Sequence, residues 1–323
     1  GSVVGLCRIC GGAAEKFFRV REMMFGSRDE FGYFQCADCG CLQISEIPSN
    51  IGEYYPVDYY SFHGGSKNTR LLRDWIRKKR ALYAIERKGL VGALLYAVKK
   101  PDPLFSIYGR IGATPRDSVL DVGGGCGQHT MSLRRIGFEK AFSIDPNIAG
   151  DIEADGSVIA RKAEIFDIDG VFDLITFHHS FEHMENPKGV LAKACRLASM
   201  SGRILIRVPT VSSEAWETYG PNWSNLDAPR HLYLHSRDSI SRLAEAAGLR
   251  ILDMWCDSVA FQFWGSEQYA ADIPMNDTRS YSQGLAGSIF TERNIKEFEQ
   301  RACELNRNDR GDLLCVLFGP TQA

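Results

Sequence analysis

The stretch Ser118-Val-Leu-Asp121-Val-Gly-Gly-Gly-Cys-Gly127 decides the fold, together with the apolar run Ala141-Phe-Ser-Ile144 that stops at Asp145. Glycines directly after a short apolar strand let the backbone turn sharply and approach a ligand closely. A second strand that ends in an acidic residue is typical of α/β sites for nucleosides. The two strand ends therefore predict a nucleoside-binding α/β domain.

The spacing of the glycines distinguishes two kinds of nucleoside ligand. A dinucleotide fingerprint, Gly-x-Gly-x-x-Gly, counted from Gly123 would need glycine where Gln128 stands. The chain instead has Asp-x-Gly-x-Gly-x-Gly from Asp121 to Gly127. A carboxylate at the strand end repels a pyrophosphate and attracts an ammonium group. The spacing therefore argues against a dinucleotide.

This pattern resembles motif I of the class I S-adenosylmethionine-dependent methyltransferases. The resemblance implies that Asp121 lies near the methionyl end of the cofactor, that Asp145 accepts both ribose hydroxyls, and that Ala163-Glu164 contacts the adenine. It also implies a Rossmann-like α/β fold with a seven-stranded sheet whose last strand is antiparallel. The cofactor-binding residues that follow from it are Asp121, Gly123, Gly125, Gly127, Asp145, Ala163, Glu164 and His178.

Two CxxC pairs near the N-terminus, each followed by a glycine, predict a metal site. Four thiolates in a tetrahedral array bind zinc and leave no position for a substrate. We therefore predict a structural zinc ribbon, with an iron centre or a redox pair as alternatives. The residues between the pairs carry charges of both signs, which favours a docking or substrate-lid role over binding of nucleic acid. The predicted ligands are Cys7, Cys10, Cys36 and Cys39.

Length and composition suit a catalytic core with a small extra module, since the chain has 323 residues, a net charge of -2 and 44% apolar residues. No apolar run approaches the ~20 residues needed to cross a bilayer, and no secretory leader is recognisable, so we predict a cytoplasmic protein. Three parts are expected: a zinc ribbon with an aromatic linker over 1–62, a basic helical segment over 63–110, and a methyltransferase domain over 111–323 with substrate insertions at 210–235 and 258–312.

Residues 67–100 carry eleven Lys or Arg against Asp74 and Glu86, a local charge of +9. The apolar spacing predicts two amphipathic helices divided near Gly89. One interpretation is a solvated helical pair that covers the core. The other is a surface for the diphosphate of a nucleotide-linked or lipid-linked sugar, with peripheral contact to an anionic membrane.

Glycines and capping residues predict the ends of further helices. A helix over 128–136 should stop at Gly137, and Asn186 should cap a helix that runs to Gly202. Ser236 should open another helix that stops at Gly248.

The catalytic candidates are His183, His231 and Glu182. An alcohol is a poor nucleophile while protonated, so a histidine within hydrogen-bond reach would assist its methylation. Glu182 would orient His183, or join His179 and His183 around a divalent ion. The alternative is that these histidines only cap helices or bridge backbone groups.

The segment His178-His-Ser-Phe-Glu182-His183 resembles the strand end of many small-molecule methyltransferases. Pro229-Arg-His231-Leu resembles methyltransferases encoded with bacterial surface-polysaccharide genes. These resemblances imply an S-adenosylmethionine-dependent methyltransferase that O-methylates a sugar hydroxyl in polysaccharide or glycoside biosynthesis. A sugar C-methyltransferase of a natural-product pathway, a ribbon-guided RNA methyltransferase and a non-catalytic binding protein are the alternatives, and a nucleic-acid partner is not favoured.

Overall fold

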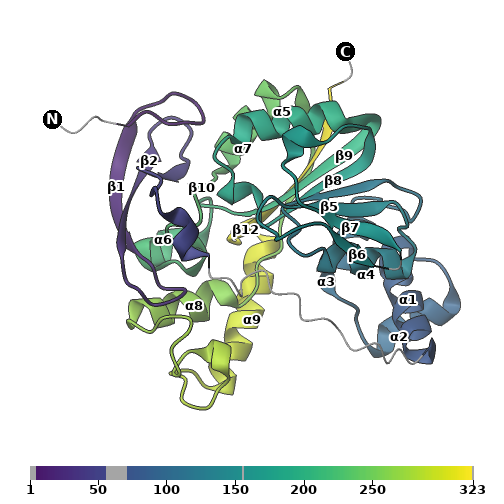
Figure 1. Cartoon of the computed structure of the whole chain (residues 1–323). Helices are drawn as coiled ribbons and strands as arrows, with labels where there is room; N and C mark the ends of the chain where they lie inside the picture. The colour runs from purple at the N-terminus through teal and green to yellow at the C-terminus, as the bar shows by residue number, and fades with distance from the viewer. Residues whose placement is uncertain (1–4, 56–70, 155, 322–323) are drawn as a thin grey trace. The chain divides into compact units, whose positions relative to one another are not determined.

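The structure is a computed structural model, and it describes residues 5–55, 71–154 and 156–321 (Figure 1). The chain divides into two compact units, each built from separate segments. The ribbon unit contains Gly1–Pro56, His179–Ala192 and Ile206–Thr321, and the glycine-loop unit contains Val57–His178, Lys193–Leu205 and Gln322–Ala323. Residues 56–70, which hold most of the predicted aromatic linker and the start of the predicted basic segment, lie outside the described residues.

The ribbon unit contains a small antiparallel sheet in the order β1-β2-β3-β10. Its strands are β1 (Ala14–Arg21), β2 (Glu30–Cys36), β3 (Leu42–Ile44) and β10 (Tyr233–Leu234). The first three strands are consecutive, whereas β10 comes from the predicted insertion at 210–235. Tyr33, Leu42 and Ile44 are fully buried in this sheet. The insertion therefore completes the sheet of the cysteine-rich segment.

A second sheet has the order β11-β12-β9-β8-β4-β5-β7-β6 among the described residues. Strands β4, β5, β7 and β8 pair in parallel, whereas β11 and β12 pair antiparallel, as predicted for the last strand. The strands are β4 (Val119–Val122), β5 (Ala141–Ile144), β6 (Ile152–Ala154), β7 (Ser157–Arg161), β8 (Phe172–His178), β9 (Ala198–Pro209), β11 (Leu249–Cys256) and β12 (Leu313–Pro320).

The prediction of seven strands was wrong by one, because β6 adds an eighth strand at the edge. β6 pairs antiparallel with β7, which follows it almost at once. Gly156 has a φ of +77° between them, a conformation that glycine adopts without a steric penalty. A short hairpin of this kind leaves little hydrophobic periodicity to recognise in the sequence.

The helices begin and end largely at the predicted residues. In α4 the C-cap is Gly137, α2 follows Gly89, and the Ser236 side chain caps α7 by accepting from the Ser239 N–H. Asn186 caps α5 through Gly189 N at 3.0 Å. The helices are α1 (Leu71–Glu86), α2 (Leu90–Val98), α3 (Pro103–Arg110), α4 (Gln128–Ile136), α5 (Pro187–Leu197), α6 (Glu214–Tyr219), α7 (Arg237–Ala246), α8 (Phe261–Ala270) and α9 (Glu292–Arg307).

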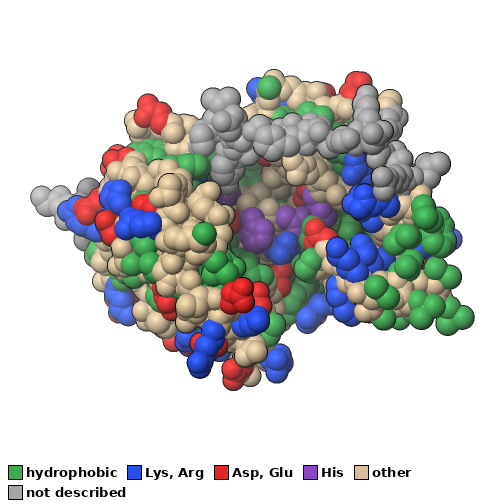
Figure 2. Space-filling view, turned by 90° about the horizontal axis from the view of Figure 1, so that it is seen from below, with side chains coloured by type: hydrophobic (Ala, Val, Ile, Leu, Met, Phe, Trp, Pro, Cys, Tyr) green, Lys and Arg blue, Asp and Glu red, His purple; other side chains and the backbone are tan. Residues whose placement is uncertain are grey.

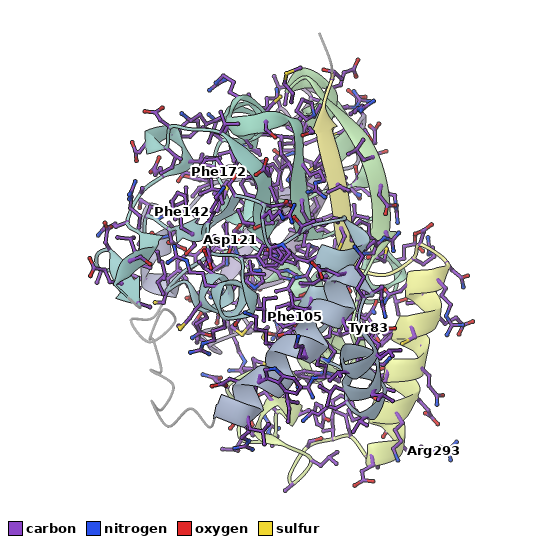
Figure 3. The ribbon with its side chains drawn as sticks, turned by 90° about the vertical axis from the view of Figure 1, so that its right-hand side faces the viewer. Tyr83, Phe105, Asp121, Phe142, Phe172 and Arg293 are labelled. Atoms are coloured by element: carbon purple, nitrogen blue, oxygen red, sulfur yellow. The ribbon has the colours of Figure 1, made fainter. Side chains whose placement is uncertain are left out.

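The interior of the glycine-loop unit is built around β4, which is buried along its whole length. Phe142 of β5 and Phe172 of β8 flank it, with ring centroids 5.8 Å apart (Figure 3). Each Val, Leu or Ile buried in such a strand contributes about 1.5–3 kcal/mol relative to an exposed side chain. The strand is thus a rigid base for Asp121, which lies near its end (Figure 3).

None of the helices in the described ranges combines the length and the apolar character needed to span a bilayer.

Candidate functional site

The glycine loop of the glycine-loop unit turns back over the end of β5. Gly123, Gly125 and Gly127 have φ values of +75°, +53° and +74°, the left-handed region that favours glycine. The N–H groups of Gly123 and Gly124 both donate to the Ile144 carbonyl, at 2.8 and 3.2 Å. The loop therefore brings the ends of β4 and β5 together, as the sequence predicts.

Gly124 is a residue that the sequence analysis did not single out. A Cβ atom at this position would lie 2.6 Å from Ser143 Cβ and 2.7 Å from Asp121 Oδ2. Real Cβ atoms do not tolerate such contacts, so only glycine fits. The unbroken run of glycines from Gly123 to Gly125 was the available signal in the sequence.

Asp121 is held inside the glycine-loop unit with 2% of its surface exposed. Its Oδ1 accepts a hydrogen bond from Thr176 Oγ1 at 2.8 Å. Burial raises the pKa of Asp121 to about 7, although the Thr176 hydrogen bond acts in the opposite direction. A cation bound beside this buried carboxyl group would favour its charged form.

Asp145 has both carboxylate oxygens anchored by backbone N–H groups. Its Oδ2 accepts from Gly125 N at 3.0 Å, and its Oδ1 accepts from Asn147 N at 2.8 Å. Each carboxylate oxygen can accept a further hydrogen bond. The side chain is thus fixed in orientation and still able to accept the two hydroxyls of a ribose.

The predicted adenine contact lies on the connection that follows β7. Ala163 is half-buried and Glu164 is exposed, and the Glu164 N–H donates to Asp167 Oδ2 at 3.1 Å. This bond opens the short 3-10 helix Ile165–Asp167. The role of these residues toward adenine stays a prediction.

His178, at the end of β8, belongs to a cluster that the sequence analysis identified only in part. The buried Tyr108 hydroxyl lies 2.8 Å from His129 Nε2 and 3.4 Å from His178 Nε2. The two imidazole rings are 4.9 Å apart. His129 could have been noticed as the second residue of the helix that follows the loop, whereas Tyr108 of α3 carries no such signal.

In the ribbon unit, the four predicted cysteine ligands converge. Their sulfurs lie within 4.8 Å of one another, with Cys7 and Cys39 3.6 Å apart and Cys10 and Cys36 3.4 Å apart. Tetrahedral zinc with Zn–S bonds of about 2.3 Å requires sulfurs about 3.8 Å apart. The N–H groups of Ile9, Gly12 and Cys39 donate to three of the sulfurs. The donor set and its hydrogen bonds therefore fit zinc.

The three catalytic candidates also converge within the ribbon unit. Glu182 and His183 lie in the 3-10 helix Phe181–His183, and His231 precedes β10. The Leu232 N–H donates to the Glu182 carbonyl at 2.9 Å, which joins the two segments. One ligand atom of each of the three side chains lies within 4.8 Å of the other two.

Both histidines are oriented by backbone carbonyls. His183 Nδ1 lies 2.8 Å from the Arg230 oxygen, and His231 Nδ1 lies 2.7 Å from the Asn225 oxygen. A carbonyl only accepts hydrogen bonds, so each ring donates from Nδ1 and carries its lone pair on Nε2 when neutral. The Tyr55 hydroxyl, 3.1 Å from His183 Nδ1, adds a further contact.

The electrostatics of this cluster are those of a buried site. Glu182 is 1% exposed, and neither of its carboxyl oxygens has a hydrogen-bond partner among the described residues. Burial raises the pKa of Glu182 to about 8. Burial, and then the charge of His183, lowers the pKa of His231 to about 3. His231 Nε2 lies 3.9 Å from Glu182 Oε1 and 3.8 Å from Asp227 Oδ2.

His179, which the sequence offered as a partner of Glu182, is placed differently from the other two histidines. Its φ of +53° turns the backbone between β8 and the 3-10 helix, and its side chain is 41% exposed. Its Nδ1 is 3.9 Å from Glu182 Oε1, yet it does not belong to the converging group.

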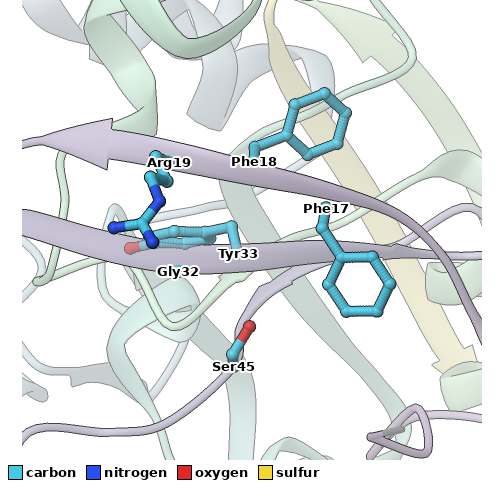
Figure 4. Close-up of a pocket in the computed structure, with 6 residues that line it drawn as sticks. All are labelled: Phe17, Phe18, Arg19, Gly32, Tyr33 and Ser45. Carbon is cyan, nitrogen blue, oxygen red and sulfur yellow. The ribbon is translucent and has the colours of Figure 1, made fainter. Parts of the chain in front are cut away.

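A pocket of about 440 Å³ lies on the small sheet of the ribbon unit and contains none of the predicted site residues (Figure 4). It is lined by Phe17, Phe18, Arg19, Gly32, Tyr33 and Ser45.

Comparison with known proteins gives the family. Residues 72–253, more than half of the chain, match a family described as a methyltransferase domain. No curated protein matches the chain. Many solved structures align with the chain. The three described below have TM-scores under 0.5, so the family assignment rests on the family match alone.

Three of these solved structures are methyltransferases. Geranyl diphosphate C-methyltransferase from Streptomyces coelicolor A3(2) is 14% identical, with 84% of this chain and 97% of that chain covered and a TM-score of 0.43. The 1,6-didemethyltoxoflavin-N1-methyltransferase of Burkholderia thailandensis is 13% identical, with coverages of 80% and 93% and a TM-score of 0.39. A SAM-dependent methyltransferase from Archaeoglobus fulgidus is 17% identical, with coverages of 62% and 84% and a TM-score of 0.38.

The family match spans the glycine loop, both acidic strand ends and the Glu182–His231 segment. The chain therefore belongs to the methyltransferase-domain family and is an S-adenosylmethionine-dependent methyltransferase.

Proposed function

We propose that this methyltransferase O-methylates a sugar hydroxyl in the biosynthesis of a polysaccharide or glycoside. The observation that carries the proposal is the cluster of the buried Glu182 with His183 and His231, which are both half-buried. A sugar hydroxyl must lose its proton as it attacks a methyl group, whereas an amine or an acidic phenol needs less help. A buried imidazole beside a carboxyl group is the kind of side-chain pair that performs this task.

The glycine-loop unit is proposed to hold the cofactor. The loop backbone and Asp121 would receive the methionyl part, Asp145 the ribose, and Ala163 and Glu164 the adenine. Bound S-adenosylmethionine supplies an electrophilic methyl group on a sulfonium. Because charge is neutralised as that methyl group is transferred, the protein contributes most by aligning the reactants and excluding water.

The ribbon unit is proposed to act on the acceptor. His183 or His231 would take the hydroxyl proton at Nε2, since Nδ1 of each ring is already a donor to a carbonyl. A protonated His231 would be stabilised by the Asp227 carboxylate, whose Oδ2 lies 3.8 Å from its Nε2. Burial, and then the charge of His183, lowers the pKa of His231 to about 3, so the ring is neutral before the reaction and its Nε2 can accept a proton.

Zinc at Cys7, Cys10, Cys36 and Cys39 is proposed to be structural. The four thiolates leave no open position, which fits a closed site. The small sheet next to the thiolates includes β10, and β10 begins two residues after His231. The metal would therefore stabilise the segment that carries a catalytic candidate.

Peripheral contact with an anionic membrane is proposed for α2. Leu90, Leu94 and Val98 are 86%, 70% and 87% exposed on this helix. Lys and Arg residues stand directly before and after it, at Arg87, Lys88, Lys99 and Lys100. Figure 2 shows exposed hydrophobic side chains next to Lys and Arg at its right-hand side, over α1 and α2. An exposed apolar helix with flanking positive charge is suited to an anionic lipid surface, and the acceptor would then be lipid-linked.

The membrane contact is tested with vesicles of phosphatidylcholine, with and without phosphatidylglycerol. The protein should sediment with the anionic vesicles only, and Leu90→Ser combined with Leu94→Ser should abolish this. Met200→Ser, at another exposed apolar side chain, is the control. If the double variant sediments as well as the wild type, this helix does not bind the membrane. If the wild type instead forms concentration-dependent dimers that the double variant abolishes, a second copy of the chain covers this face and the membrane proposal is rejected.

The acceptor is tested by methyl transfer from labelled S-adenosylmethionine to nucleotide-linked sugars and lipid-linked sugars. Mass and NMR spectra of the product distinguish an O-methyl from a C-methyl group. Of the His183→Ala and His231→Ala variants, the one that lacks the base should be inactive while still binding the cofactor in calorimetry, and equal activity of the two variants would reject the assignment of a histidine base. Transfer to RNA alone, or to a sugar carbon, would reject O-methylation.

A further inference from the structure

We propose that Glu182, His183 and His231 bind a divalent first-row metal ion. This site is distinct from the four cysteines. Its chemical role rests on the proposed function, because the ion would act on the acceptor hydroxyl. The existence of the site does not depend on the acceptor, because it follows from the side chains alone.

The geometry of the three side chains suits an ion. Ligand atoms of all three lie within 4.8 Å of one another, and His231 Nε2 is 3.9 Å from Glu182 Oε1. An ion with bonds of about 2.0–2.2 Å to two such atoms fits between them at this separation. The imidazole rings are 4.7 Å apart and inclined by 71°, so they do not stack and can approach one ion from different directions.

The second observation is the state of Glu182. Its two oxygens are buried, and neither has a hydrogen-bond partner among the described residues. Leaving an ionised carboxylate without partners in the interior costs several kcal/mol. A divalent cation between Glu182 and the histidines would satisfy this group, which the protein alone does not.

The histidines are already arranged as metal ligands usually are. Metal-binding histidines donate their other ring N–H to a carbonyl or carboxylate, which fixes the ring and directs the ligand nitrogen. His183 does so to Arg230 and His231 does so to Asn225. Asp227 Oδ2 lies 3.8 Å from His231 Nε2 and places a further negative charge beside the site. A hydrogen bond from Arg230 holds the Asp227 carboxylate in position.

The ligand set indicates the class of ion. Two imidazoles and one carboxylate suit zinc, iron, manganese or nickel in the divalent state, whereas magnesium and calcium prefer oxygen ligands alone. Three protein ligands leave positions open for a substrate oxygen. With an ion bound, the histidine nitrogens are ligands and no longer accept a proton, so the ion would take over the task proposed above for a histidine base. A sugar hydroxyl bound to it would release its proton to water more readily, and its oxygen would then form a bond to the methyl carbon while the carbon–sulfur bond breaks.

Mn²⁺ is the probe of choice, because it binds thiolates poorly and therefore reports on this site while zinc occupies the cysteines. The full chain, loaded with zinc and freed of other metals, is titrated with Mn²⁺, and free Mn²⁺ is measured by electron paramagnetic resonance. The wild-type chain is expected to bind Mn²⁺ with one ion per chain. Glu182→Gln and His231→Gln, which keep a similar side-chain size, should each weaken binding at least about tenfold.

His129→Gln provides the matched control, because it removes a histidine from the other unit and should leave Mn²⁺ binding unchanged. Circular dichroism confirms that each variant is folded. No Mn²⁺ binding, or equal binding by the wild type and both cluster variants, would overturn the metal site even if sugars are methylated. Mn²⁺ binding that both cluster variants weaken supports it even if no sugar in the panel is an acceptor.

Discussion

Arg230 donates a hydrogen bond to Glu22 Oε1 at 2.8 Å, and both side chains are 0% exposed. Glu22 directly follows β1, whereas Arg230 belongs to the insertion that ends in β10. The same guanidinium donates to Asp227 and to the Tyr54 carbonyl. One buried cation thus connects the cysteine-rich segment to the segment that carries His231.

Replacing Arg230 by alanine should destabilise the ribbon unit severely. The change leaves Glu22 and Asp227 as buried carboxylates without their cation, and breaking a buried pair in this way costs about 3–5 kcal/mol. Thermal unfolding followed by near-ultraviolet circular dichroism measures the loss. Arg242→Ala is the control, since its pair with Asp238 is exposed and should contribute little. Equal midpoints for the two variants would contradict the role assigned to Arg230.

Cofactor affinity should fall as the pH is lowered below about 7. Burial raises the pKa of Asp121 to about 7, and the cofactor ammonium favours the charged carboxylate. Below that pH the carboxyl group must lose a proton on binding, which weakens affinity by up to about tenfold per pH unit. Calorimetry between pH 5.5 and 7 in buffers of different ionisation enthalpy should detect the released proton. Asp121→Asn should bind weakly and independently of pH, whereas Asp145→Asn should bind weakly and keep a pH dependence, shifted to lower pH because the Asp145 charge contributes to the raised pKa of Asp121.

Gly124→Ala should abolish cofactor binding or prevent folding of the loop. The added methyl group would lie 2.6 Å from Ser143 Cβ and 2.7 Å from Asp121 Oδ2, so the loop must move away from Asp121. Gly150→Ala is a matched change, since a Cβ there meets nothing within 4 Å. Cofactor binding and thermal midpoints are compared for both variants. A Gly124→Ala protein that binds as well as Gly150→Ala would contradict the close packing of the loop.

Cys36→Ser should remove bound zinc and, with it, methyl transfer. Loss of one of four thiolates opens a closed site, and the fold of a small metal-held segment depends on its ion. Metal analysis by mass spectrometry and the transfer assay give the two readouts. Cys303→Ser, at an exposed cysteine of α9, should keep both zinc and activity. Zinc retained in full by Cys36→Ser would refute the four-cysteine site.

Local signals in the sequence predicted much of the fold. The ends of α4 follow from Gly127 and Gly137, and the start of α7 follows from Ser236. These are short-range effects of backbone conformation and side-chain capping. One helix end was wrong: α5 stops at Leu197, and Gly202 lies within β9, where a Cβ would be 2.7 Å from Ser199 N. Glycine there serves close backbone approach, which the sequence pattern does not distinguish from a helix stop.

The parts of the site that the sequence did not reveal depend on contacts between distant residues. His231 was a candidate by resemblance, but its meeting with Glu182 depends on the bond from Leu232 N to the Glu182 carbonyl. Tyr108 reaches His129 and His178 from a helix that carries no motif. Periodicity describes one element at a time, so such convergence is visible only in the folded chain.

The strand β10 has a consequence for the history of this chain. Three strands of the small sheet lie in the cysteine-rich segment, and the fourth lies far downstream, within the insertion. A descendant that lost the cysteine-rich segment would leave β10 without its neighbour and Arg230 without Glu22. The two stretches must therefore be inherited together, and a substitution in one creates selection on the other. Relatives of this protein should keep both or lack both.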